Sequence, residues 1–289
     1  MKNKSSSFLE TLQDKGTKLL DSQFSQATKP LFIQTRANQS LSSKILIVVN
    51  ESWGQTSNSE YQNAILTPIL QKRNQLIFLK QGDFNFIGAT VNGELRELCN
   101  KQSTTFSLKN VNSIEFKDCL PNKLKDLGYQ TYSIHGASGE LYDRLSWYPK
   151  AGFKKSYFFN DLSNGGMCKS FSGRCDVKII PKIKSILHED HKSLVYWMTL
   201  NTHAPYDDKL FINGLNCRQL KLNENSESCK NLKLHYQFFS ALSQLIDDPS
   251  MQGLEVYVAG DHSPPIFNMR ENLFTFKGAS VAWIHFKIK

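Results

Sequence analysis

The sequence predicts an α/β fold, with a mostly parallel central sheet and helices on both of its faces, and two observations predict it. Short apolar, β-rich runs alternate with segments of helical periodicity along most of the chain. Several of these runs end in a polar residue, at the position where open α/β sheets hold their ligands. With 289 residues and a hydrophobic content of 40%, the chain is long enough for one large domain with its own core.

Six runs are predicted to be strands because each is short, apolar and bounded by polar or turn-forming residues. They cover residues 45–49, 76–79, 129–134, 194–200, 254–259 and 281–286. Four segments between them are predicted to be helices, at residues 61–73, 120–127, 181–188 and 234–245. Gly128 stands just after the second helix, where glycine commonly ends a helix, and Pro181 stands in the first turn of the third.

Residues 1–43 are expected to be an N-terminal linker or juxtamembrane segment, and a compact domain is expected to span residues 44–289. Four apolar residues of the linker are spaced to share one helical face: Phe8, Leu12, Leu19 and Leu20. No run approaches the roughly 18 apolar residues of a membrane span, and the first residues lack the apolar centre of a signal peptide. Two alternatives follow: a cytosolic protein, or the soluble part of a longer chain.

The six cysteines favour the second alternative. None stands in a CxxC metal motif, and several lie in polar segments rather than in apolar runs. We expect local disulfides between neighbours along the chain, namely Cys99–Cys119, Cys168–Cys175 and Cys217–Cys229. Scattered reduced thiols in a cytosolic protein are the alternative. Disulfides predict an oxidising compartment, such as the bacterial periplasm or an outer cell surface.

The net charge of +9 excludes no partner by itself, but the basic residues are dispersed along the chain. No zinc finger, RNA-recognition strand or basic helix with interleaved aromatic residues is present, so we expect no nucleic-acid partner. A basic surface suits a domain that lies on an anionic lipid leaflet. Simple solubility is the alternative interpretation.

Polar residues with metal-binding or catalytic chemistry follow four predicted strands. They are Glu51, His135, His203 and the pair Asp261 and His262. Parallel strands bring their carboxyl ends to one edge of a sheet, so these residues are expected to form one active site. A carboxylate beside an imidazole offers the oxygen and nitrogen ligands that suit zinc or manganese. Any one of these residues alone would more often be structural.

A candidate nucleophile stands between the first two of these strand ends. Thr90 lies in a glycine-flanked turn before a helical segment that begins near Leu95. A hydroxyl at the N-terminus of a helix faces backbone N–H donors and the positive end of the helix dipole. The alternative is that Thr90 only caps the helix, a role that threonine fills well.

Together these motifs resemble the sulfatase-like branch of the alkaline phosphatase superfamily, and within it lipoteichoic acid synthases, phosphoglycerol transferases and phosphoethanolamine transferases. The residues that carry the resemblance are Glu51, the Gly-flanked Thr90, His135 with Arg144, His203 in Asn-Thr-His-x-Pro, and Asp261 with His262. The resemblance covers about Lys44 to the C-terminus, and it implies a sulfatase-like catalytic domain there.

The resemblance also implies a role for each residue. One divalent ion, Zn²⁺ or Mn²⁺, would be held by Glu51, Thr90, Asp261 and His262. Thr90 would attack a phospholipid head group, His135 and His203 would bind the phosphate or the acceptor, and Arg144 would pair with a phosphate oxygen. Glu94 and Trp147, in the same two segments as Thr90 and Arg144, are expected to contact the substrate. For Trp147 a core position is the alternative.

The expected function is transfer of phosphoethanolamine or phosphoglycerol from a phospholipid to a cell-surface glycan or lipid-linked acceptor, through a phospho-threonine intermediate. The formylglycine motif of sulfatases is absent, so sulfate ester hydrolysis is disfavoured. The alternatives are a phosphodiesterase or phosphatase, or a non-catalytic module that binds a glycan or a lipid head group. The expected location is the periplasm or the outer face of the inner membrane, with an anchoring segment outside this chain. Residues 141–161 and 207–230 are expected to be loops around the acceptor.

Overall fold

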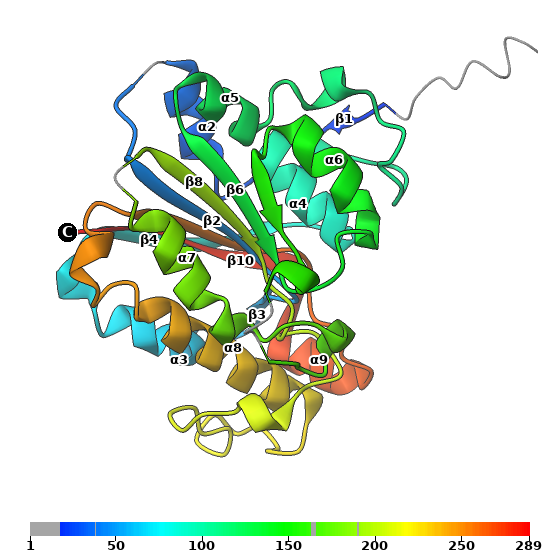
Figure 1. Ribbon diagram of the computed structural model, residues 1–289. Helices are drawn as coiled ribbons and strands as arrows, with labels where there is room; N and C mark the ends of the chain where they lie inside the picture. The colour runs from blue at the N-terminus through cyan, green and yellow to red at the C-terminus, as the bar shows by residue number, and fades with distance from the viewer. Residues whose placement is uncertain (1–17, 38, 163–165, 190) are drawn as a thin grey trace, which may run out of the picture.

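The computed structural model describes residues 18–37, 39–162, 166–189 and 191–289. Its centre is an eight-stranded sheet in which the strands follow the order β3-β10-β9-β2-β8-β6-β7, with β4 also paired to β10 (Figure 1). The strand bounds are β2 (Lys44–Asn50), β3 (Gly54–Thr56), β4 (Leu76–Asn85), β6 (Gln130–His135), β7 (Lys155–Tyr157), β8 (Ser193–Met198), β9 (Glu255–Gly260) and β10 (Phe276–Ile288).

The central strands β9, β2, β8, β6 and β7 are parallel to one another. The remaining strands join antiparallel through β10, which pairs with β9, β4 and β3. The predicted α/β class with a mostly parallel sheet is therefore confirmed. β8 and β9 are buried along their whole length. Strands covered on both faces have no solvent side, and this explains their nearly continuous apolar sequence.

Helices cover both faces of the sheet (Figure 1). One face carries α3 (Ser59–Leu70), α7 (Ile180–Leu187) and α8 (Glu227–Ser243). The other carries α2 (Lys29–Arg36), α4 (Thr90–Cys99), α5 (Leu120–Asp126) and α6 (Arg144–Ala151). Successive residues of a strand point to opposite faces, so Val48 packs in the first layer and Ile47 in the second. Each layer has its own apolar core.

The N-terminal segment differs from the expected linker where it is described. Residues Leu20–Asp21 form β1, which pairs with β5 (Lys101–Gln102), so Leu20 lies in a strand and not on a helical face. Leu19 is buried in the second core. Glu97 of α4 accepts hydrogen bonds from the backbone N–H groups of Ala27 and Thr28, at 3.3 and 3.1 Å. A buried carboxylate distant in sequence thus fixes this segment. Phe8 and Leu12 lie outside the described residues.

The segment 141–161, expected to be a loop, contains α6 and β7. The helix α6 contains Pro149 and ends two residues later, at Ala151. The segment 207–230 contains a short 3-10 helix at Asp208–Leu210, is otherwise irregular up to Ser226, and then enters α8. These regions therefore present short structured pieces at the edge of the sheet.

The three expected disulfides are present, and none lies in the central sheet. Cys99–Cys119 joins the end of α4 to the start of α5, and Cys168–Cys175 closes a short loop before α7. Cys217–Cys229 ties the preceding loop to the first turns of α8. Within the part of the chain that is described, no helix has the length and apolar character needed to cross a membrane.

Candidate active site

The carboxyl ends of β9, β2, β8 and β6 meet at one edge of the sheet, as expected for neighbouring parallel strands (Figure 1). Glu51 follows β2, and Asp261 and His262 follow β9. His135 is the last residue of β6, and His203 lies in the loop after β8. The strand ends singled out in the sequence therefore share one edge.

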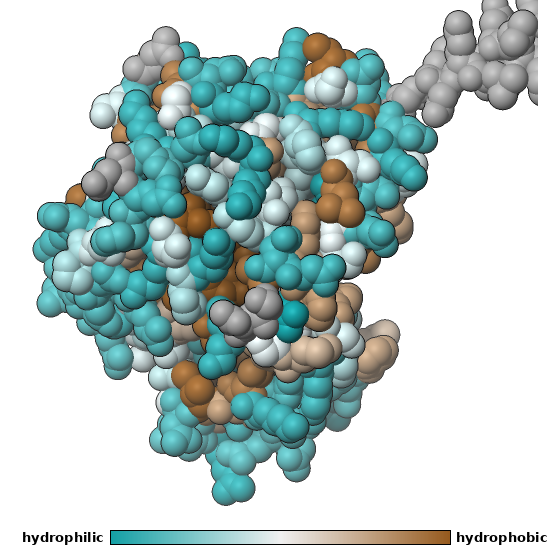
Figure 2. All heavy atoms as spheres, viewed as in Figure 1, coloured by the Kyte–Doolittle hydropathy of each residue, from teal (hydrophilic) through white to brown (hydrophobic). Residues whose placement is uncertain are grey.

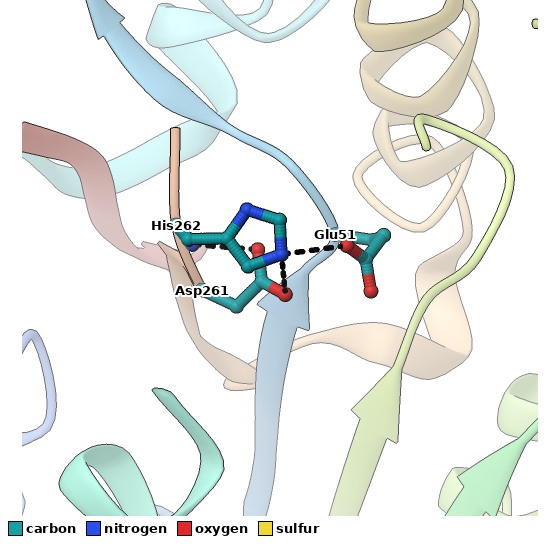
Figure 3. A group of neighbouring side chains, drawn as sticks. All are labelled: Glu51, Asp261 and His262. Carbon is teal, nitrogen blue, oxygen red and sulfur yellow. Dashed lines mark hydrogen bonds and ion pairs between the residues drawn. The ribbon is translucent and has the colours of Figure 1, made fainter. Parts of the chain in front are cut away.

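Glu51, Asp261 and His262 form a compact group whose ligand atoms all lie within 4.8 Å of one another. The Nε2 atom of His262 lies 3.2 Å from Glu51 Oε1 and 3.3 Å from Asp261 Oδ2 (Figure 3). Asp261 Oδ1 accepts from the backbone N–H groups of Ser52 and His262, both at 2.7 Å. Asp261 Oδ2 is buried and accepts no hydrogen bond from the described residues. An unsatisfied carboxylate oxygen beside a second carboxylate and an imidazole fits a divalent cation such as Zn²⁺ or Mn²⁺.

The electrostatics of this group also favour a bound cation. Burial, together with the charge of Glu51, raises the pKa of Asp261 to about 7. Burial alone would lower the pKa of His262, but the charges of Asp261 and Glu51 outweigh it and raise that pKa to about 10. The imidazole therefore keeps a proton between two carboxylates. A metal ion would supply the positive charge that this proton supplies in its absence.

Backbone contacts hold Glu51 in place. Its N–H donates to Thr199 Oγ1 at 2.9 Å, and its carbonyl accepts from the hydroxyl of Thr202. Ser52, with φ of 55°, has a left-handed backbone that serine seldom adopts. His235 of α8 donates from Nε2 to the Ser52 carbonyl at 3.1 Å. Burial lowers the pKa of His235 to about 3, so this imidazole is a neutral structural donor.

Thr90 is the first residue of α4, and its N-cap is Ala89. The capping interpretation of Thr90 is therefore wrong. The first turn of α4 packs against Asp261, because a Cβ at Gly93 would lie 2.9 Å from the Cα of Asp261. The hydroxyl of Thr90 contacts the phenol of Tyr142, whose pKa is raised by burial and lowered by this contact. The charges of Glu51 and Asp261 also raise the pKa of this phenol.

Arg144 and His135 form a buried pair behind this site. Arg144 Nη1 donates to His135 Nε2 at 3.2 Å and to the Leu141 carbonyl at 3.1 Å. His135 Nδ1 donates to the Met198 carbonyl at 3.1 Å. Burial, helped by the charge of Arg144, lowers the pKa of His135 well below its usual value, so this imidazole is neutral. Both of its nitrogens are occupied.

Glu94 and Trp147 do not face a substrate, contrary to expectation. Both are fully buried. Glu94 Oε1 accepts from Arg144 Nε and Nη2 at 2.9 and 2.6 Å, and its Oε2 accepts from the hydroxyls of Tyr148 and Tyr196 at 2.5 and 3.0 Å. Trp147 stacks on Phe116 in the second core. Glu94 thus orients Arg144, and Trp147 takes the alternative core position.

His203 lies on the opposite side of the metal group. Its ring centroid is 6.3 Å from that of His262, and its side chain is partly exposed. The loop closed by Cys168–Cys175 packs on it, with the Phe171 ring 4.9 Å away and Ser170 Oγ donating to the His203 carbonyl at 2.8 Å. His203 and His262 are therefore the partly exposed histidines of this site, whereas His135 is buried.

Two residues near the site were missed in the sequence. Tyr142 contacts Thr90, and Asp176 accepts at Oδ2 from the backbone N–H groups of Leu200 and Asn201, at 2.9 and 2.7 Å. Tyr142 lies in the segment already noted for Arg144, but nothing in its spacing distinguishes it from a core aromatic. Asp176 gives no local signal, because its partners belong to the loop after β8.

A hollow of about 500 Å³ opens beside the metal group. It is lined by Phe86, Ile87, Gly88, Ala89, His262, Ser263 and Ala279. The residue before Thr90 and one residue of the metal group therefore line the same opening. A phosphate ester entering it would meet both.

Comparison with known proteins is consistent with this geometry. Among solved structures, the lipoteichoic acid synthase LtaP from Listeria monocytogenes is similar with a TM-score of 0.60 and 17% identity, over 84% of this chain and 65% of that one. The phosphoglycerol transferase GacH from Streptococcus pyogenes, in complex with sn-glycerol-1-phosphate, gives a TM-score of 0.55 and 16% identity over 94% and 78%. The C-terminal periplasmic domain of EptC from Escherichia coli, in complex with Zn, gives 0.56 and 14% over 94% and 77%.

At these identities the structural likeness establishes the fold, and this chain spans less than two thirds of the Listeria chain. No curated protein sequence matches it. The sulfatase family model matches residues 43–268, which include the strand ends and every residue of the metal group. This chain therefore belongs to the sulfatase family.

Proposed function

We propose that this chain is the catalytic domain of a metal-dependent transferase that moves phosphoethanolamine or phosphoglycerol from a phospholipid to a cell-surface glycan or lipid-linked acceptor. One observation carries the proposal: the buried group of Glu51, Asp261 and His262 lies against the first turn of α4, where Thr90 stands. The names of the similar structures, a phosphoglycerol transferase and a lipoteichoic acid synthase among them, support the choice of reaction.

Glu51, Asp261, His262 and the hydroxyl of Thr90 would hold one Zn²⁺ or Mn²⁺ ion. A divalent ion at this position supplies a positive charge that favours ionised Thr90 and stabilises negative charge on the phosphoryl oxygens. The zinc complex of the EptC domain supports zinc as the first ion to test. Thr90 also lies at the N-terminus of α4, where the positive end of the helix dipole is located.

In the first step, Thr90 Oγ forms a bond to the head-group phosphorus, and the bond from phosphorus to the diacylglycerol oxygen breaks. Diacylglycerol leaves, and its oxygen takes up the proton that Thr90 Oγ has given up. In the second step, an acceptor hydroxyl bonds to the phosphorus and Thr90 Oγ leaves. His203, which is partly exposed, takes the proton of the acceptor hydroxyl, and Thr90 Oγ recovers a proton as it leaves.

Arg144 and His135 support this reaction from the buried side of the site. Four N–H groups of the guanidinium are engaged by Glu94, His135 and the Leu141 carbonyl. One of the five guanidinium donors remains for a phosphoryl oxygen. The Tyr142 ring covers Arg144 at 5.3 Å from its centroid, so this contact requires the ring to move as the phosphate enters.

The reaction fits an extracytoplasmic location with the membrane nearby. The three disulfides persist in an oxidising compartment. The similar EptC domain is periplasmic. A phospholipid donor also needs no nucleotide, so the transfer can proceed outside the cytoplasm. We place the domain in the periplasm or on the outer face of the inner membrane, anchored by a segment outside this chain.

The test is incubation of the zinc-loaded or manganese-loaded protein with head-group-labelled phosphatidylethanolamine and phosphatidylglycerol in parallel. We expect release of diacylglycerol from one of them and a labelled phosphate ester on Thr90, located by mass spectrometry. Thr90→Ala should abolish release. The matched control is Thr67→Ala, because Thr67 is a partly exposed threonine near the end of α3 and lies outside the site. Normal release by Thr90→Ala would contradict the nucleophile assignment, and release only in the form of hydrolysis would favour a phosphodiesterase.

A further inference from the structure

An apolar surface follows the metal group along the chain. Its members are large side chains that remain exposed, by 86%, 76%, 70% and 60%, and we call them the apolar ridge: Phe267, Met269, Leu273 and Phe274. α9 (Met269–Thr275) carries three of the four. Figure 2 shows apolar side chains gathered at the place where Figure 1 labels α9. Large apolar side chains exposed together on a folded domain indicate an interaction surface.

The apolar ridge is adjacent to the opening of the site. Phe267 follows His262 after a short irregular segment, and His262 lines the hollow described above. Ile87, which also lines that hollow, is 73% exposed. A ligand that enters the hollow would therefore meet an exposed apolar side chain at its lining.

The acidic residues nearest to the apolar ridge are turned towards the body of the domain. Glu271 accepts from the backbone N–H of Ser228 at 2.5 Å, and Glu227 accepts from the backbone N–H of Phe267 at 2.8 Å. These contacts anchor α9 to the start of α8. They also pair each of these carboxylates with a backbone N–H group.

The charge that this face does carry is positive. Arg270 is exposed and forms no ion pair with the residues that the structure describes. The chain as a whole carries a net charge of +9. Apolar side chains combined with cations are the composition of segments that lie in the interface of an anionic bilayer, where the apolar groups enter the head-group region and the cations meet lipid phosphates.

We propose that the apolar ridge and Arg270 dock this domain on a lipid bilayer that contains anionic head groups, with the hollow beside His262 facing the lipid. The inference rests on the proposed function, because a phospholipid must bring its phosphate to Thr90 while its acyl chains remain in the bilayer. Docking by α9 places the hollow at the level of the head groups. The surface that determines which membrane the domain binds is then separate from the metal group.

The test is sedimentation of the whole 289-residue protein with vesicles of phosphatidylethanolamine and phosphatidylglycerol, compared with vesicles of phosphatidylcholine alone. We expect binding to the anionic vesicles. Replacing Phe267, Leu273 and Phe274 together with serine should weaken that binding by at least about tenfold, because three large apolar groups no longer leave water. Arg270→Gln should weaken binding to the anionic vesicles by about fivefold and leave binding to phosphatidylcholine unchanged.

The matched control replaces exposed isoleucines of similar accessibility elsewhere on the surface with serine. They are Ile33, Ile77 and Ile114, exposed by 54%, 55% and 57%. This triple variant should bind vesicles as the unmodified protein does. Circular dichroism and metal content of both triple variants establish that the fold and the metal group are retained.

Three results would overturn the proposal. The first is absence of vesicle binding, and the second is equal binding by the two triple variants. The third is self-association of the unmodified protein that is lost in the ridge variant, because the ridge would then be an interface between copies of this chain. The assay needs no turnover, so it separates docking from catalysis. Thr90→Ala should still bind vesicles. If it does while no phospholipid head group is released by the unmodified protein, the proposed function fails and the docking surface stands.

Discussion

Gly93 of α4 lies so close to Asp261 that a Cβ on the glycine would be 2.9 Å from both the Cα and the Cβ of the aspartate. Real Cβ atoms do not approach other carbons so closely, so only glycine permits this packing. The contact joins the helix that begins with Thr90 to the residue pair that follows β9. In the proposed mechanism, this glycine therefore sets how closely the helix that carries Thr90 approaches the metal group.

Gly93→Ala should move the first turn of α4 away from Asp261, weaken metal binding and lower turnover. Overpacking of this kind costs about 1–3 kcal/mol. Alanine favours a helix interior over glycine by about 1 kcal/mol, so a net loss of stability can come only from the clash. Urea unfolding and metal titration measure the two effects. Gly278→Ala is the control, because no atom lies within 4 Å of a Cβ there. Unchanged metal affinity in Gly93→Ala would show that the contact does not set the geometry.

Arg144→Lys should be damaging although the charge is kept. The guanidinium binds Glu94 through two nitrogens and His135 through a third. The lysine ammonium is a single donor centre, so it cannot reproduce the planar fork that binds Glu94 through two nitrogens and reaches His135 with a third. Leaving part of a buried ion pair unmatched costs about 3 kcal/mol or more. Denaturant unfolding should show this loss, and turnover should fall as well. The exposed Arg218→Lys, with a side chain that is 81% accessible, should change neither.

Acid should weaken the fold through Glu255. Burial opposes ionisation, but hydrogen bonds from His285, Ser42 and Tyr257 outweigh it and lower the pKa of this carboxyl to about 2. The unfolded value is about 4.3. The folded pKa is the lower one, so the contribution is present above about pH 4.3 and is lost as the pH falls towards 2. It amounts to about 2–3 kcal/mol.

Glu255→Gln should remove this part of the pH dependence. The free energy of unfolding, measured in urea at several pH values between 6 and 3, should fall less steeply for the variant than for the unmodified protein. Equal slopes for the two proteins would mean that the carboxyl has an ordinary pKa in the fold. Glu255 begins β9 at the end opposite to the metal group, so metal content should not change between them.

Much of this site was predictable because the rule for parallel sheets is topological. Glu51 and Asp261 are distant in sequence, but β2 and β9 are parallel neighbours and bring them together. The N-terminal segment was not predictable in the same way. Leu19 is buried against helices that come much later in the chain, and local composition alone suggested a linker.

The sequence also did not reveal which charged residues are buried, and this led to the second wrong expectation. Glu94, which stands four residues after Thr90, was expected to meet a substrate. Its partner Arg144 is 50 residues away, and no local pattern indicates that the two form a buried pair. Trp147 was undecided between pocket and core for the same reason, since only the packing of α6 on Phe116 decides it. Residues that act by positioning another side chain can be identified only from the packed structure.

The loop closed by Cys168–Cys175 provides the last prediction. Besides its contacts with His203, this loop reaches the residue after His135, because the Arg174 N–H donates to the Gly136 carbonyl at 2.9 Å. Replacing both cysteines with serine removes the disulfide, so the loop can adopt a wider range of positions in the folded protein. His203 then loses the support of Phe171.

We expect the double serine variant to retain its metal and to release diacylglycerol at a nearly normal initial rate, because Thr90 and the metal group do not touch this loop in the contacts described above. Transfer to the acceptor should slow, so phospho-threonine should accumulate. Rapid quenching followed by mass spectrometry of the Thr90 peptide measures this directly. The same treatment of a Ser170→Ala variant, which keeps the disulfide and loses one hydrogen bond to His203, should show a smaller accumulation. A double variant in which the first step slows and no phospho-threonine builds up would instead assign the loop to donor binding.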